Sequence, residues 1–449
     1  MIGRLRPFVA PAYLFLCLLA GGSAQGVWTN AVLRLIAIGI IGWALVDRSR
    51  NSLPRGIKQL LLLVHLALAW SVFQLIPLPI SIWTSLPGRS QLVDGFGLLG
   101  IAPSFMPLSL APYDSISALL ALLPPLGMLA AMIGLRGYSA AWLAAALIGG
   151  TIAGVLLGIL QVTSGDPASS NWYLYPQTNF GVATGFFANG NHMASLLLAA
   201  IPFIAALGAT AGRATDVRLR SAALALVGGG LVVVILGLAL NGSLAGYGLG
   251  LPVVLASMLI LFGRRSAIGR AAFAATIVAC IVAVAVLWAS PVNRGVGSSV
   301  SSRQEILSHG IGLVEKYGLV GAGVGTFEEV YGSSEQPSQV ELIYVNHAHN
   351  DYLELAIEAG VPAMLLILFF LAWWVRSLVQ MMRSPASDQY AFAGAIASAA
   401  LLLHSLVDYP LRTAAMSTVF AMCVVLIVLS RRTSQSEEDL RPVRHVVIG

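Results

Sequence analysis

The run VPAMLLILFFLAWWV, residues 361–375, decides the fold of this chain, because it is apolar throughout and carries no charged side chain. A helix needs about 20 such residues to cross the roughly 30 Å of hydrocarbon in a bilayer. Similar runs recur along the 449-residue chain, of which 57% is hydrophobic and only 10% is charged. So little polar surface cannot cover a soluble globule, and the sequence therefore predicts a membrane protein.

The apolar runs predict an all-α polytopic membrane protein with about twelve transmembrane helices and a long helical loop between the ninth and tenth. The expected units are spans one to nine with short loops (1–289), the long outer loop (290–360), spans ten to twelve (361–430) and a tail (431–449). The twelve expected spans are 8–22, 28–46, 57–77, 115–135, 139–160, 188–208, 221–241, 246–262, 270–289, 361–379, 389–407 and 414–430.

The basic residues predict how the chain is oriented. All but six of the 25 Lys and Arg residues fall on one side of these spans, and short loops rich in Lys and Arg stay in the cytoplasm. We therefore expect both termini in the cytoplasm and the long loop outside, in the periplasm if the chain lies in a bacterial inner (plasma) membrane. The net charge of +6 then reflects loops that face anionic membrane lipids, and it predicts no nucleic-acid partner.

Two helices are expected within the long loop. An apolar residue recurs every third or fourth position in residues 303–317, which predicts an amphipathic helix. Its apolar face, with Leu307, Ile311 and Val314, is expected to lie against the membrane or the transmembrane bundle. A short helix should follow from about residue 350 to residue 359, and its spacing places Asn350, Glu354 and Glu358 on one face. The intervening glycine run, residues 321–325, lacks the strand and helix of a nucleotide-binding loop and is interpreted as a flexible turn.

The segment NHAHNDYLE, residues 346–354, concentrates polar chemistry at the start of the tenth span. His349 is the leading catalytic candidate, because an imidazole can accept a proton from a hydroxyl near neutral pH. The other reading, two exposed loop histidines, is less favoured because amide and carboxylate residues surround them. The candidate substrate-binding residues around it are His347, Asn350, Asp351, Tyr352 and Glu354.

No metal or other cofactor is expected. His347 and His349 with nearby carboxylates resemble part of a ligand set, but no Cys or further His at a suitable spacing completes one. All three cysteines fall inside apolar spans, so neither a disulfide nor a cysteine-based metal site is predicted.

Arg303 is the second catalytic candidate, because it stands on the outer side, where cations are scarce. A guanidinium fork binds phosphate oxygens bidentately and would suit a diphosphate. The alternative, a surface salt bridge with Glu305, is equally compatible with the sequence. Arg34 and Arg412 are further outer cations that could contact the same substrate.

Two more polar clusters lie near the outer ends of spans. Asn191, in the run GFFANGNH (185–192), could bind substrate or cap the sixth span, with capping slightly favoured. His404 and Asp408 lie one turn apart near the end of the eleventh span. We interpret them as a hydrogen-bonded pair that holds the helix end.

Several of these motifs resemble those of the O-antigen ligase and polymerase superfamily of bacterial membrane glycosyltransferases, the Wzy/WaaL-like proteins. The motifs, in the family's order, are PLSL (107–110), GFFANGNH (185–192), SR (302–303) with GAGVGTF (321–327), HAHNDYLE (347–354) and HSLVDYPL (404–411). The resemblance implies a GT-C-like, metal-independent enzyme that moves a glycan from an undecaprenyl diphosphate carrier to a hydroxyl of a glycan or lipid A-core acceptor. It also implies that His349 is the loop histidine of the family and Arg303 its diphosphate-binding arginine.

The chain departs from the family pattern at Leu244, in the turn NGSLAG (241–246), where many relatives carry arginine. Either Arg34, Arg294 or Arg412 then supplies the second diphosphate contact, or the chemistry differs from that of the ligases. Two other functions stay open. A transporter or flippase would need charged or broken helices near the midplane, which the sequence lacks, and a protein O-oligosaccharyltransferase would differ only in its acceptor.

Overall fold

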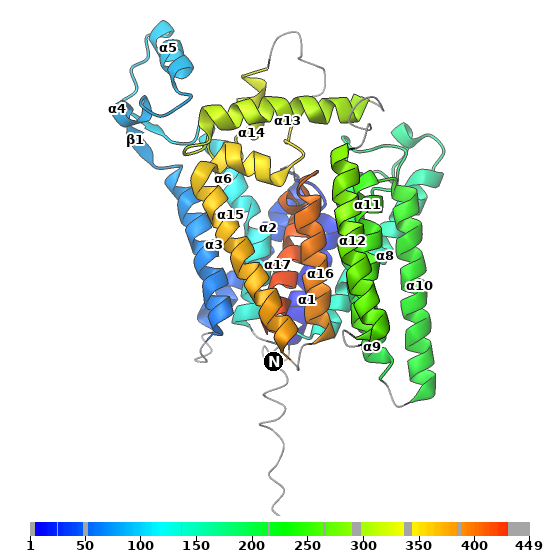
Figure 1. Cartoon of the computed structure of the whole chain (residues 1–449). Coiled ribbons are helices and arrows are strands. Elements are labelled where there is room, and N and C mark those ends of the chain that lie inside the picture. The colour runs from blue at the N-terminus through cyan, green and yellow to red at the C-terminus, as the bar shows by residue number, and fades with distance from the viewer. Residues whose placement is uncertain are drawn as a thin grey trace, which may run out of the picture.

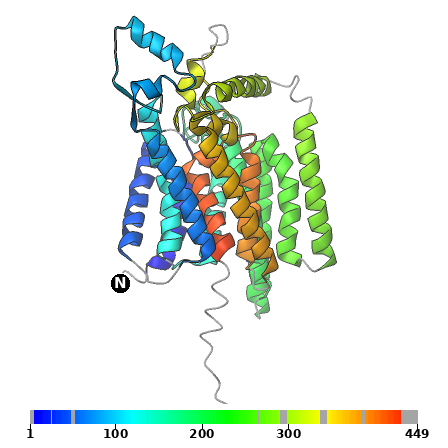
Figure 2. The same cartoon turned by 60° about the vertical axis from the view of Figure 1, so that its left-hand side comes forward.

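The computed structural model describes residues 5–24, 26–47, 53–135, 137–213, 216–263, 266–289, 298–335, 344–384 and 388–429. Long helices stand side by side in a bundle, and the helix α13 (Ser298–Tyr317) lies across one end of it (Figure 1). The N-terminus lies at the opposite end of the bundle in both views (Figures 1 and 2). The bundle helices are α1 (Arg6–Ala20), α2 (Trp28–Val46), α3 (Arg55–Phe73), α6 (Pro112–Ala121), α7 (Leu123–Leu129), the π-helix η2 (Ala130–Gly134), α8 (Ala140–Thr163), α9 (Gly190–Ala211), α10 (Val217–Asn241), α11 (Leu244–Phe262), α12 (Ala267–Ala289), α15 (Asp351–Arg383), α16 (Gln389–His404) and α17 (Ala414–Leu429).

Every predicted span coincides with an apolar helix or, in the case of α6, α7 and η2, with a stack of consecutive helices. Eight candidate spans in the described residues are long and apolar enough to cross a membrane, and the other apolar stretches, α1, α16, α17 and residues 267–279 of α12, are shorter. The predicted class, a mainly helical multi-pass membrane protein, is confirmed. The number of helices that cross the membrane and the direction in which they cross stay predictions.

Helix α9 is the centre of the bundle, since 83% of its most apolar 18-residue stretch is buried. It packs against α8, α10, α11 and α16. Small residues make this possible, because alanine side chains let neighbouring helices approach closely, and residues 199–200 and 205–206 are both Ala-Ala pairs. By contrast, α3 and α10 are each 17% buried and leave apolar faces for lipid. The central position of α9 brings its first turn beside the end of α16.

A small antiparallel ribbon, which the all-α prediction did not include, lies above α3. Its strands are β1 (Pro77–Pro79) and β2 (Phe105–Pro107), and the short helices α4 (Ile80–Trp83) and α5 (Ser90–Leu98) connect them. Helix α5 stands clear of the bundle in both views (Figures 1 and 2). Arg89 fastens the ribbon to α13, because it is fully buried, its guanidinium donates to the Leu108 carbonyl at 2.8 Å, and it lies 5.6 Å from the Tyr317 ring.

Helix α13 confirms the predicted amphipathic helix, but the face that packs on the bundle is not the predicted one. Leu307 and Ile311 are 44% and 51% exposed, whereas Ile306 and Leu313 are buried. Each residue turns a helix by about 100°, so the true face is displaced by one residue from the predicted one. The reason is tertiary, since α13 packs on α15 through Gly310, where a Cβ would lie 2.8 Å from the Leu353 side chain.

The start of α15 is a short helix that ends at Gly360, where the backbone leaves helical geometry with φ 64° and ψ −160°. This confirms the predicted short helix before the tenth span. The glycine run 321–325, followed by α14 (Phe327–Gly332), packs against it. The Gly323 N–H donates to the Glu358 carbonyl at 2.8 Å, and Ala322 is fully buried. The run is therefore a turn that is packed against the short helix, and its interpretation as a flexible turn was wrong.

Candidate active site

Asp408 is the centre of the polar groups at the α13 end of the bundle. It lies between α16 and the 3-10 helix η5 (Pro410–Arg412) and is fully buried. His349 Nδ1 lies 3.5 Å and His192 Nε2 3.7 Å from Asp408 Oδ1. Arg303 Nη2 lies 3.7 Å from Oδ2, which also accepts a hydrogen bond from the Asn191 amide. One carboxylate thus gathers side chains from α9, α13 and the segment before α15.

The charge of Asp408 is set by these neighbours. Burial by itself raises the pKa of the carboxyl, but the imidazoles of His192 and His349 beside it outweigh burial and hold the pKa well below its usual range. Asp408 is therefore an anion at neutral pH. A buried anion needs partners, and the two imidazoles and Arg303 supply them.

Asn191 holds Asp408 in place. Its amide nitrogen donates to Asp408, and its amide oxygen accepts from the Ser243 hydroxyl at 2.7 Å. Ser243 caps α11 and directly precedes Leu244, so the turn in which the family arginine is replaced connects to Asp408 through Asn191. The capping that was favoured for this motif is made by Asn189, whose side chain accepts from the Asn191 N–H. Since both ends of the Asn191 amide are occupied, it orients Asp408.

His349 has a special backbone conformation, because its φ of 49° is the only positive value among the described residues other than glycine. A left-handed conformation is uncommon in residues with a side chain and persists where the surroundings enforce it. With Nδ1 turned to the Asp408 carboxylate, Nε2 is left for a substrate hydroxyl. The Tyr409 ring fixes the position of the imidazole further, since it lies 5.1 Å from His349 edge-on and 4.8 Å from His192.

A polar cavity of about 570 Å³ adjoins these residues, and His192, His349 and Tyr409 line it. The rest of its wall comes from the turn after α1, from the loop before α9 and from residues 344–346. Its volume falls within the range of about 300–1,000 Å³ typical of small-molecule sites. A substrate in this cavity would contact the imidazole that Asp408 orients.

Arg412 belongs to a separate, closed cluster. Its guanidinium lies 2.9 Å from Glu358, 3.0 Å from Glu354 and 3.6 Å from Asp351. These three carboxylates lie on one face of the short helix at the start of α15. All three carboxylates face the guanidinium, which is therefore neutralised within the cluster, and Arg412 stabilises the fold of this segment.

Glu354 links this cluster to the histidine segment. Its carboxylate accepts from His347 Nδ1 at 2.8 Å and from the Ala348 N–H at 2.9 Å, in addition to pairing with Arg412. The His347 ring packs on Tyr409 at 4.1 Å. Glu354 and His347 therefore position the backbone that carries His349.

The other predicted site residues have structural contacts. Asn350 caps α15 by accepting from two backbone N–H groups, so the predicted face of Asn350, Glu354 and Glu358 is wrong and Asp351 takes the place of Asn350. Asp351 accepts from the Ser405 hydroxyl at 2.7 Å, and Tyr352 donates to the Leu402 carbonyl at 2.9 Å.

Arg34 stands apart from these groups. It lies on α2, which packs against α1, α6, α7 and η2, and no ion pair joins it to the site in the described part of the chain.

The predicted side-chain pair of His404 and Asp408 is wrong. His404 Nδ1 instead lies 2.8 Å from the Ser195 hydroxyl, while Asp408 faces His192 and His349. The sequence located Asp408 but not its role, because its partners lie up to 217 positions away along the chain. Tyr409 was missed as a site residue. Its position beside Asp408 was the available signal.

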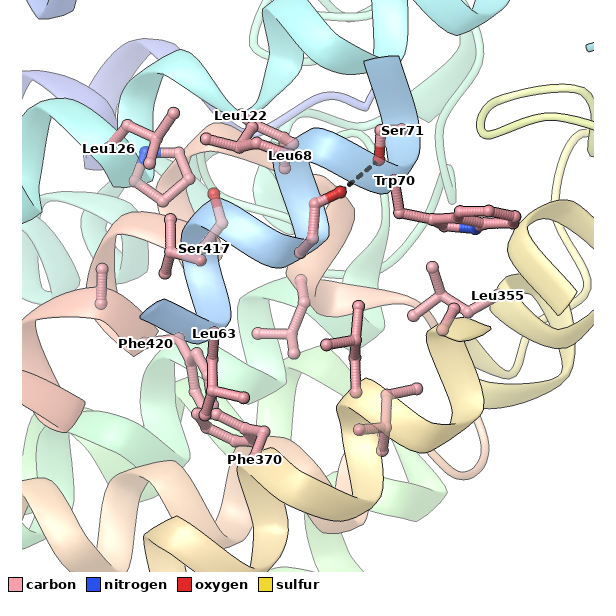
Figure 3. A pocket seen from close by; sticks show the side chains of 18 of the residues that line it. Leu63, Leu68, Trp70, Ser71, Leu122, Leu126, Leu355, Phe370, Ser417 and Phe420 are labelled. Atoms are coloured by element: carbon pink, nitrogen blue, oxygen red, sulfur yellow. Dashed lines mark hydrogen bonds between the residues drawn. The ribbon is translucent and has the colours of Figure 1, made fainter. Parts of the chain in front are cut away.

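A second cavity, of about 380 Å³, lies inside the bundle between α3, α7, α15 and α17 (Figure 3). Its walls are leucine, phenylalanine and other apolar residues, and its two serine hydroxyls donate to carbonyls of their own helices. The labelled side chains of Leu63, Leu126 and Phe370 show its apolar character (Figure 3). This cavity suits hydrocarbon and offers no acid, base or phosphate ligand.

Comparison with known proteins supports the family resemblance. Residues 203–368 match the family model described as O-Antigen ligase, a region that includes Arg303, His347 and His349. This match supports the O-antigen ligase and polymerase superfamily, and with the apolar helices it indicates a multi-pass membrane glycosyltransferase. No curated protein matched the chain. Within the described residues no group of three or more His, Cys, Asp or Glu has the arrangement of a metal site.

Proposed function

We propose that this protein is a glycosyltransferase that faces the periplasm and moves a glycan from undecaprenyl diphosphate to an acceptor hydroxyl. One observation carries the proposal: the two catalytic candidates, His349 and Arg303, contact the same buried carboxylate, Asp408, from opposite oxygens. The site thereby combines a base that lines the cavity, the carboxylate that faces this base, and a cation on the other side of that carboxylate. These are the parts that transfer from a diphosphate leaving group requires.

The step follows from these positions. The acceptor oxygen forms a bond to the anomeric carbon of the donor sugar, the bond from that carbon to the diphosphate oxygen breaks, and the electron pair leaves with the diphosphate. His349 Nε2 takes the acceptor proton, and Asp408 stabilises the resulting imidazolium through Nδ1, as carboxylates do in hydrolase triads. Attack opposite the leaving group inverts the anomeric configuration.

Arg303 suits the leaving group better than Arg34 and Arg412 do. Its side chain is 39% exposed and has a single long contact to Asp408, so it can turn toward a diphosphate. Charge grows on the diphosphate as the bond breaks, so a cation there stabilises the transition state more than the ground state. Arg412 is occupied by three carboxylates.

The position of the polar groups favours this function over transport. They gather at the α13 end of the bundle, in loops and first turns of helices, whereas a transport path needs polar groups near the midplane. Ligase, polymerase and protein O-oligosaccharyltransferase share the proposed step and differ in the acceptor.

The test is complementation of a strain that lacks the gene, with variants at matched membrane expression. Arg303→Ala and His349→Ala should lose transfer, while Arg376→Ala and His65→Ala, at exposed positions on α15 and α3, should retain it. Accumulation of single lipid-linked repeats would indicate a polymerase, and untransferred full-length lipid-linked chains a ligase. Unchanged glycans in both site variants would refute the proposal.

A further inference from the structure

The cavity beside His349 is lined by polar and apolar groups and is nearly free of charge. It presents backbone and side chains from four loops, and no Lys, Arg, Asp or Glu stands among the described residues that line it. Arg303 does not line it either. Aromatic rings of Phe180, Tyr344 and Tyr409 contribute apolar faces. The carboxamides on its wall are Gln177, Asn179, Asn189 and Asn346.

Some polar atoms on this wall have no hydrogen-bond partner among the described residues. The Thr178 hydroxyl and His192 Nδ1 are buried and make no hydrogen bond within the described residues. Buried polar groups in proteins are paired in the great majority of cases. Both residues line the cavity, but neither atom is exposed to it. A rotation of either side chain would let the atom pair with a hydroxyl group of a bound molecule.

We propose that this cavity binds the acceptor sugar, and that it selects a sugar ring without an ionised group; this inference rests on the proposed function above. Carboxamides and hydroxyls donate and accept hydrogen bonds, which matches the hydroxyl and acetamido groups of hexoses and N-acetylhexosamines. Aromatic faces cover the apolar side of a sugar ring. A uronate or sugar phosphate would lose its hydration here without gaining a Lys or Arg partner.

The geometry places the charged substrate on the other side of Asp408. Arg303 approaches Oδ2 of this carboxylate, whereas His349, which lines the cavity, approaches Oδ1. The diphosphate of the donor would therefore meet Arg303, and the acceptor hydroxyl would reach His349 from the cavity. The charged diphosphate of the donor and the neutral acceptor sugar would thus bind on opposite sides of Asp408.

The first test is linkage analysis of the glycans made with and without the gene in its own host. The linkage that disappears on deletion identifies the acceptor sugar, and we expect a neutral hexose or N-acetylhexosamine. A hexuronate or phosphorylated sugar at the acceptor side would overturn the inference while leaving the proposed function intact. If no linkage disappears, the proposed function itself fails, and the inference fails with it.

The second test is a pair of matched variants, Thr178→Val and Thr163→Val, compared in transfer rate and melting temperature. Removing an unpaired buried hydroxyl should leave the fold as stable as before or more stable. We expect Thr178→Val to lose transfer by about 5- to 10-fold, the value of one hydrogen bond. Such a loss without a loss of stability would locate substrate binding at the cavity. Thr163 donates within α8 to the Ile159 carbonyl at 2.8 Å, and its variant should transfer normally. Wild-type transfer by Thr178→Val would overturn the assignment of the cavity.

Discussion

Replacing Arg412 by Met should destabilise this protein far more than replacing Arg303 by Met, although both cations lie at the same end of the bundle. Arg412 contacts three carboxylates at 2.9, 3.0 and 3.6 Å, and the side chains of Glu358 and Glu354 are 2% and 1% exposed. Without the guanidinium, these buried acids lose the cation that they share. Arg303 has one contact, at 3.7 Å, and is 39% exposed.

The magnitudes follow from burial. Breaking a buried ion pair by removing one partner costs about 3–5 kcal/mol, which lowers the melting temperature by roughly 6–10 °C at about 2 °C per kcal/mol for a long chain. An exposed pair contributes about 0–1 kcal/mol, so Arg303→Met should melt within about 2 °C of the wild type. Arg412→Lys should fall between, because lysine keeps the charge but lacks the planar fork.

The assay is thermal unfolding of the purified variants in one detergent, with transfer activity measured in parallel. We expect Arg303→Met to be stable and inactive, and Arg412→Met to be unstable. Equal melting temperatures for Arg412→Met and the wild type would refute the structural role of Arg412. A large loss of stability in Arg303→Met would show that Arg303 is held in the fold and is not available to a substrate.

Three further outcomes are expected. Asp408→Asn should slow transfer by about 100-fold or more. The pKa of Asp408 in the folded protein is held below its usual value. The stabilising charge is therefore present above the unfolded pKa of about 3.9 and is lost only as the pH falls through the lower folded pKa. At about pH 5 the wild type should therefore melt at a higher temperature than this variant, and equal melting temperatures at that pH would contradict the reasoning. Ser243→Ala should slow transfer by about 3- to 10-fold, the value of one hydrogen bond. Asn191→Leu should slow it more, since of these two residues only Asn191 contacts Asp408. A larger effect of Ser243→Ala would contradict the proposal that Ser243 acts on Asp408 through Asn191. Gly321→Ala should destabilise the fold by at least about 2 kcal/mol, because its Cβ would lie 2.2 Å from a main-chain carbonyl oxygen at a φ of +83°, whereas Gly332→Ala, with no atom within 4 Å, should melt normally.

The membrane class and the helix positions followed from the sequence, because the hydrocarbon imposes length and apolarity on each span separately. The short helix before Gly360 and the amphipathic α13 were predicted for a similar reason, since caps, glycine stops and periodicity are local signals. The face of α13 that packs on the bundle was not predicted. Leu307 and Ile306 are both apolar, and only contact with α15 determines which of them is buried.

The candidate site divides in the same way. The sequence alone led to the prediction that His349 and Arg303 are the catalytic groups, because they are scarce polar residues on one side of an apolar chain. It could not determine that Arg412 is neutralised by acids of α15, nor that Asp408 orients His349, because hydrogen bonds and ion pairs depend on distances of a few ångströms between segments far apart in the chain. Tertiary packing decided both: it brings the first turn of α9, the start of α13 and the segment before α15 around one buried carboxylate, whose charge requires partners in a region without water.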